Sequence, residues 1–169
     1  MKTVSIVLLS LTAVSSGATW YKGNTHTHSS NSDGSSSPSA VIQWYVGNGY
    51  NFLAVTDHNW FSPQEAFGLA TTYNTPSFLL LTGEEVTDFA SDPDPNKRGA
   101  IHILGLNINQ RVFTAPPGTP AAEVVRTDTA AIRAARGIPI YAHPVKDQGF
   151  ATHLRCSCAP LFRLQWLQS

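Results

Sequence analysis

The sequence predicts an α/β fold in which strands and helices alternate along the chain. Short apolar runs bounded by turn residues recur at 52–56, 78–81, 100–106 and 138–142, and a first strand is expected at 20–27. Segments with helix-start signals or helical spacing lie between several of these runs. Such alternation is typical of a parallel sheet or barrel.

Three helices are expected, and the first two begin in the same way. Ser37 and Ser62 each stand before a proline, which gives a serine N-cap and a proline at the first helical position. Glycines at 47 and 49 should stop the first helix, and the second should run to about Thr72. The third is expected over 120–136, with Thr119 as its cap and Gly137 as its stop.

Composition excludes some classes of partner. The 169 residues are 42% hydrophobic and only 13% charged, and the formal net charge is zero. No cluster of lysine or arginine is present, so no nucleic-acid partner is expected. Cys156 and Cys158 are too close in sequence to support a disulfide framework.

The first residues resemble a secretory signal peptide. Lys2 precedes a mostly apolar run over 4–14, and small residues follow at 16–18. The apolar run is too short to span a bilayer. The prediction is a signal peptide over 1–18, a secreted protein, and no membrane partner after cleavage.

Potential metal ligands gather at the predicted strands. His26 and His28 are one residue apart, so the alternation of a strand would direct both imidazoles to one face. Carboxyl ends of parallel strands meet at one face, which brings residues distant in sequence together. A single histidine is more often structural than a ligand, but five of the six histidines share this placement, which favours a metal centre: His26, His28, His58, His102 and His143.

The residue types also suit hydrolysis. Imidazoles and carboxylates together hold borderline divalent ions, and a carboxylate such as Glu85 can bridge two of them. Such ions lower the pKa of a bound water to about 7, so hydroxide forms at neutral pH. The sequence has no Gly-x-Ser-x-Gly, Gly-x-Gly-x-x-Gly or P-loop motif.

An ordered set of six motifs resembles the PHP (polymerase and histidinol phosphatase) metallohydrolase family. The opening segment 20–26 is further similar to a secreted subgroup that includes carbamate-ester hydrolases. The six motifs are His26-x-His28, Ser32-Asp33-Gly34, Thr56-Asp57-His58-Asn59, Gly83-Glu84-Glu85-Val86, His102-Ile103-Leu104-Gly105 and Ala142-His143-Pro144.

This resemblance implies a distorted seven-stranded β/α barrel with two or three divalent ions, which would be zinc, manganese or iron. Asp57 would orient His58 or a water at the metals, and a turn or helix N-cap role is the competing interpretation. The implied metal ligands are His26, His28, Asp33, His58, Glu85, His102 and His143.

The resemblance ends after Pro144. The family's Asp-x-His near the end of the barrel is missing, and 149–169 resembles nothing in the family. A closed barrel takes about 200 residues or more, so the domain at 19–148 would be an incomplete barrel with five strands. We hypothesise a truncated or mis-spliced form of a longer enzyme. The alternative is a minimal variant in which 161–167 forms a closing element.

The predicted function is metal-dependent hydrolysis of a small-molecule ester, most simply a phosphoester. The first alternative is a carbamate or carboxylic-ester hydrolase of the same fold. The second is a non-catalytic metal-binding fragment or pseudoenzyme, because the final Asp-x-His is missing.

Overall fold

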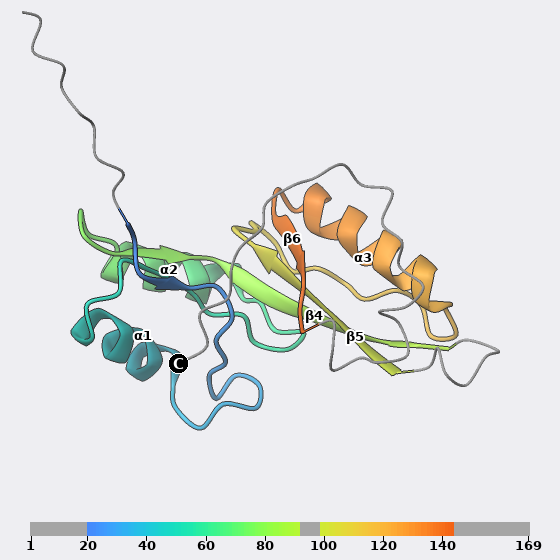
Figure 1. The fold of residues 1–169 in the computed structure, drawn as a ribbon, viewed down its shortest axis with the longest axis horizontal. Coiled ribbons are helices and arrows are strands. Elements are labelled where there is room, and N and C mark those ends of the chain that lie inside the picture. The colour runs from blue at the N-terminus through green and yellow to red at the C-terminus, as the bar shows by residue number, and fades with distance from the viewer. Residues whose placement is uncertain (1–19, 92–98, 144–169) are drawn as a thin grey trace, which may run out of the picture.

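The computed structural model describes residues 20–91 and 99–143. The predicted signal peptide at 1–18, the sequence at 149–169 and the proposed closing element at 161–167 lie outside these ranges. Nine elements follow one another in the order β1, α1, β2, α2, β3, β4, β5, α3 and β6 (Figure 1). Among the described residues, no helix has the length and hydropathy needed to cross a membrane.

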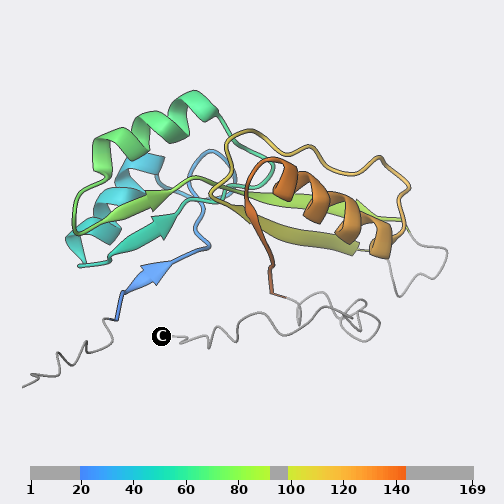
Figure 2. The ribbon, with the colours of Figure 1, turned by 90° about the horizontal axis from the view of Figure 1, so that it is seen from above.

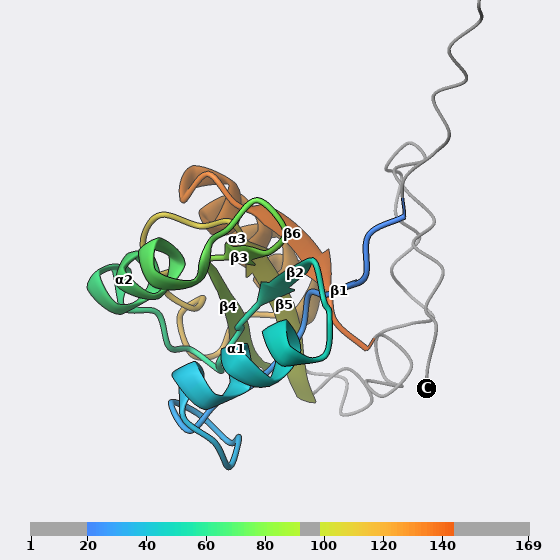
Figure 3. The same cartoon turned by 90° about the vertical axis from the view of Figure 1, so that its left-hand side faces the viewer.

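The first half of the chain forms a parallel three-stranded sheet. Its strands are β1 (Gly23–Asn24), β2 (Phe52–Ala54) and β3 (Leu79–Leu81), in that spatial order (Figure 2). Helices α1 (Pro38–Gly47) and α2 (Pro63–Tyr73) pack beside it (Figure 3). Their shared core contains residues from α1, β2 and β3, with α2 packed against it: Ile42, Leu53, Phe78, Leu80 and Leu69.

The two serine caps form as predicted. Ser37 Oγ accepts from the backbone N–H of Ala40, and Ser62 Oγ accepts from that of Glu65. These bonds satisfy backbone donors that a helix start otherwise leaves free.

The second half forms an antiparallel sheet, and here the prediction of a parallel arrangement is wrong. Strand β4 (Gly83–Ala90) pairs with β5 (Gly99–Leu106), and β5 pairs with β6 (Ile138–Tyr141), both antiparallel. Strand β3 ends at Leu81, where the predicted apolar run stops, but a new strand, β4, begins at Gly83 without an intervening helix or long loop. Residues 88–90 also belong to β4, although the Asp, Pro, Asn, Lys and Arg residues over 88–99 favour a loop. Long-range pairing with β5 overrides the local turn signal.

Helix α3 (Ala121–Ala134) covers the second sheet and buries Val124, Ile132 and β-strand residues such as Val86 and Ile103. It begins after Pro120, and no side chain caps it. Thr119, the predicted cap, instead donates its hydroxyl to the carbonyl of Pro116 at 2.6 Å.

A third, smaller apolar cluster joins the two sheets through Ala54, Leu104, Leu106 and Ala142. Residues 20–91 and 99–143 therefore form a mixed α/β structure with two sheets and three helices, and no closed barrel. The two sheets meet where the predicted ligands lie.

Candidate metal centre

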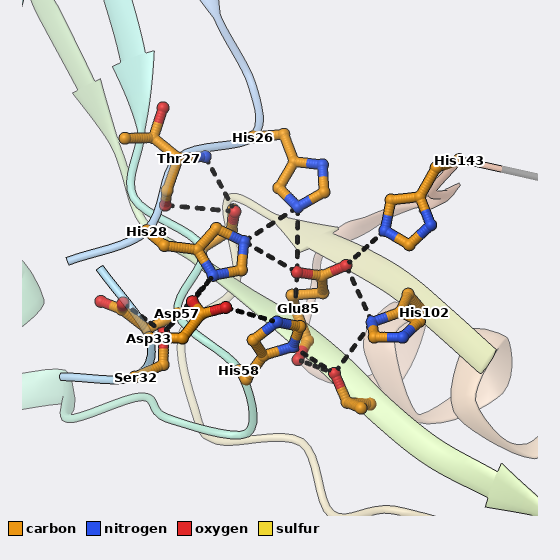
Figure 4. Close-up of polar contacts among 12 residues, drawn as sticks. His26, Thr27, His28, Ser32, Asp33, Asp57, His58, Glu85, His102 and His143 are labelled. Carbon is orange, nitrogen blue, oxygen red and sulfur yellow. Dashed lines mark hydrogen bonds and ion pairs between the residues drawn. The ribbon is translucent and has the colours of Figure 1, made fainter. Parts of the chain in front are cut away.

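One buried carboxylate is the centre of the site. Glu85 lies in the middle of β4, its side chain is only 1% exposed, and five imidazoles surround it (Figure 4). Its Oε2 lies 2.9 Å from Nε2 of both His26 and His28. Its Oε1 lies 3.1 Å from His102 Nδ1 and 3.3 Å from His143 Nε2.

Both sheets contribute imidazoles. His26 and His28 follow β1, which is much shorter than the predicted strand at 20–27. Their Nε2 atoms nevertheless lie 3.0 Å apart, so the predicted shared direction is observed. His58 follows β2, and the bridge between His58 and Glu85 joins the two halves of the molecule. His102 lies inside β5, directly opposite Thr87 of β4.

Asp33 reaches the site on a tight turn. Its Oδ1 lies 2.7 Å from His28 Nδ1, and its Oδ2 lies 3.7 Å from His58 Nε2. The backbone N–H of Gly34 donates to the carbonyl of Ser29 at 2.9 Å, which closes the turn. A Cβ at position 34 would lie 2.8 Å from backbone atoms of His28 and Ser29, so the turn requires glycine there.

Asp57 lies beside this turn, and its carboxylate accepts hydrogen bonds from residues of the turn. It is 3% exposed and accepts from the backbone N–H and the hydroxyl of Ser29, both at 2.6 Å, and from the hydroxyl of Ser32 at 2.7 Å. Its carboxylate therefore holds the turn that carries Asp33.

The electrostatics of the cluster follow from these contacts. Burial alone would raise the pKa of the Glu85 carboxyl, but hydrogen bonds from His102, His26 and His28 hold that pKa well below its usual range. The hydrogen bond to Glu85 raises the pKa of His28 against the opposing effect of burial. Burial lowers the pKa of His58, which favours its neutral, metal-ligating form.

The donor set fits divalent cations. Two ligand atoms at normal distances from one tetrahedral ion are about 3.3 Å apart. The nitrogen and oxygen pairs described above are separated by 2.7 to 3.7 Å. Two imidazole Nε2 atoms at 3.0 Å can share only one hydrogen, whereas both can bind one cation. Within the described residues, three overlapping groups offer ligand atoms that all lie within 4.8 Å of one another: His26, His28 and Glu85; His28, Asp33 and His58; and His58, Glu85 and His102.

All seven predicted ligands line one open cavity of about 550 Å³, together with Gly34 and Ala100. Two further residues at the site were not predicted. Thr87 contacts two of the imidazoles, and Asn59 holds Thr87. Reading 83–90 as a strand would have identified Thr87, because alternation places it on the same face as Glu85.

No protein-family model matches the chain, and no curated protein does. Among solved structures, an amidohydrolase from Chromobacterium violaceum, with bound sulfate and no metal, is 32% identical over 52% of this chain and 28% of its own, with a TM-score of 0.40. A candidate metal-dependent phosphoesterase from Bifidobacterium adolescentis is 26% identical over 52% of this chain and 28% of its own, with a TM-score of 0.39.

A two-domain protein from Bacteroides vulgatus, described as containing a predicted PHP-like metal-dependent phosphoesterase, is 18% identical. That match covers 78% of this chain and 37% of the other, with a TM-score of 0.49. One of the three matched structures is thus described as PHP-like, which is the family that the ordered motifs resemble. The match spans only 28% to 37% of the length of these three proteins, so their activities do not transfer directly to this chain.

Proposed function

We propose that this chain carries the metal centre of a PHP-type hydrolase that cleaves phosphoesters. The observation that supports the proposal is the Glu85 carboxylate, buried between imidazoles of both sheets (Figure 4). A buried carboxylate with nitrogen donors on each of its oxygens is suited to hold two cations side by side. Zinc, manganese and iron all accept this mixture of ligands.

Bound divalent ions would supply the Lewis acidity and the water activation that ester hydrolysis requires. The described residues place the ligands for those ions. His26 and His28 face one oxygen of Glu85, while His102 and His143 face the other. The side chain of Asp33 is 68% exposed, so it lies on the solvent side of the site, where a substrate would enter.

Carbamate or carboxylic-ester hydrolysis is the competing activity, since the same ions would polarise a carbonyl. The described lining of the cavity contains no lysine or arginine. A phosphate group would therefore depend on the cations for charge compensation, and phosphoester turnover should be the activity that is most sensitive to a chelator.

The test is metal analysis of the purified chain followed by an activity panel. We expect bound zinc, manganese or iron and turnover of an aryl phosphate ester that a chelator abolishes and added metal restores. Matched aryl carbamate and carboxylic esters should turn over more slowly. Faster turnover of either ester would favour the competing activity. Stoichiometric metal without any turnover would indicate a non-catalytic metal-binding protein.

A further inference from the structure

The edge of β4 beside the metal centre is completed by a side chain. The backbone N–H of Asn59 donates to the carbonyl of Glu85 at 3.0 Å, and that of Glu85 donates to the carbonyl of Asp57 at 3.1 Å. The chain then turns away at Asn59, whose φ is 47°, a left-handed conformation that asparagine adopts more readily than most residues. The ladder of hydrogen bonds would end here without another partner.

The side-chain amide of Asn59 continues this ladder of hydrogen bonds along the edge of β4. Its Oδ1 accepts from the backbone N–H of Thr87 at 2.8 Å, and its Nδ2 donates to the carbonyl of Thr87 at 2.7 Å. One side-chain amide thus replaces a peptide group of a neighbouring strand. Both backbone polar groups of Thr87 that face this edge are satisfied, so the orientation of Thr87 is fixed.

The hydroxyl of Thr87 lies between two imidazoles. Its Oγ1 is 2.6 Å from His58 Nδ1 and 3.3 Å from His102 Nδ1. The hydroxyl can donate to the carbonyl of Glu85 at 3.3 Å, and in that orientation its oxygen lone pairs accept from ring N–H groups. The Glu85 carboxylate is a more distant partner for His58, because Oε2 lies 3.4 Å from Nδ1.

We propose that Thr87 is a positioning residue of the metal centre, which keeps the ring hydrogen of His58 on Nδ1 and leaves Nε2 free to bind a cation. A neutral imidazole has one donor and one acceptor nitrogen, and the partner of one nitrogen determines which is which. His58 Nε2 then faces Asp33 Oδ2 at 3.7 Å, on the side of the cavity. This inference rests on the proposed metal site, and Asn59 acts only through Thr87.

The first test observes the His58 ring in the metal-free protein. In ¹⁵N NMR spectra recorded where the imidazoles are neutral, wild-type His58 should show a protonated Nδ1 and an unprotonated Nε2. The signals are assigned by their loss in His58→Gln. Thr87→Val, which removes the hydroxyl and keeps the shape, should shift hydrogen to Nε2, and Thr87→Ser should restore the wild-type pattern. An Nε2-protonated ring in the wild type, or no change in Thr87→Val, would overturn the proposal.

The second test measures cobalt(II) affinity by absorption spectroscopy. Thr87→Val should bind cobalt about 10 to 100 times more weakly, as is typical when the partner of a metal-bound histidine is removed. Thr87→Ser should match the wild type. Thr72→Val is the control, since the Thr72 hydroxyl bonds only to the Gly68 carbonyl on exposed α2, and it should change nothing. Equal affinity of Thr87→Val and Thr72→Val would contradict the proposal. If the wild type binds no cobalt, the proposed function fails, and the His58 ring pattern alone decides the role of Thr87.

Discussion

The two faces of β4 shift the pKa of a buried glutamate in opposite directions. Glu84 and Glu85 are consecutive, and both are fully buried. Burial raises the pKa of Glu84 to about 7, because only the backbone N–H of Val112 and the distant guanidinium of Arg111 offset it. The imidazoles around Glu85 keep the pKa of that carboxyl far below its usual range. Burial alone therefore does not decide the charge; the partners on each face do.

A second buried acid lies on the face under α3. Asp128 of α3 is fully buried, and within the described residues its carboxylate has no hydrogen-bond donor apart from the backbone N–H of Ala115. Burial, and then the nearby Asp88 of β4, raise its pKa to about 7. One face of β4 is thus built to hold a charge and to attract cations, while the other holds acids that favour their neutral form.

The largest expected effect comes from replacing Glu85 with glutamine. Glu85→Gln keeps the shape of the side chain and removes the charge between five imidazoles. Loss of one partner from a buried charged set costs about 3 to 5 kcal/mol, so divalent-ion affinity should fall more than about a hundredfold. Isothermal titration with zinc or manganese measures this.

Glu84→Gln is the matched control for that measurement. It lies one residue away on the face under α3 and should leave ion affinity unchanged. Glutamine can still accept from the backbone N–H of Val112, so the fold should persist. A similar loss of affinity in both variants would mean that the two faces are not separate, and the comparison would fail.

The helix starts, and the gathering of seven histidine and carboxylate residues at one place, could be predicted from the sequence, whereas the strand pairing could not. Serine followed by proline specifies a cap within four residues, and α1 and α2 begin there. Strand β3 ends where the apolar run over 78–81 stops, but the start of β4 at Gly83 was not predicted. In the structure, a Cβ at that position would lie 2.8 Å from Thr56 Cγ2, so glycine permits close approach inside a continuing chain.

The candidate site shows the same division. Seven ligand positions followed from motif order and now line one cavity. The contacts of Asn59 and Thr87 could not be predicted, because they depend on how β4 lies against the segment after β2. Those of the Asp57 carboxylate depend on how the same segment lies against the turn around Ser29 and Ser32. Both arrangements are set by long-range packing, not by local propensity.

A medium effect is expected from Asp128, and it depends on pH. The folded protein holds a proton on Asp128 up to about pH 7, whereas the unfolded chain releases it near 3.8. The contribution of Asp128 to folding stability should therefore be greatest below pH 3.8 and should fall by about 4 kcal/mol as the pH rises to 7. In Asp128→Asn the fall in stability should be smaller by about this amount, with the fall caused by Glu84 remaining, which denaturant unfolding at several pH values would show. Parallel pH profiles for the wild type and the variant would contradict a neutral Asp128.

The smallest effect is expected at Asp57. Its carboxylate is buried beside the site, and its hydrogen-bond partners, Ser29 and Ser32, are neutral. Asp57→Asn keeps one acceptor oxygen toward Ser29, and the serine hydroxyls can rotate to accept from the new amide. We expect a loss of about 1 kcal/mol in the free energy of unfolding. Ion affinity should change far less than in Glu85→Gln, because the Asp57 carboxylate holds the turn around Ser29 and Ser32. A loss of affinity as large as that of Glu85→Gln would instead show that the Asp57 charge acts directly on the ions or on His58. Asp57 would then belong with Glu85 among the residues whose charge attracts cations.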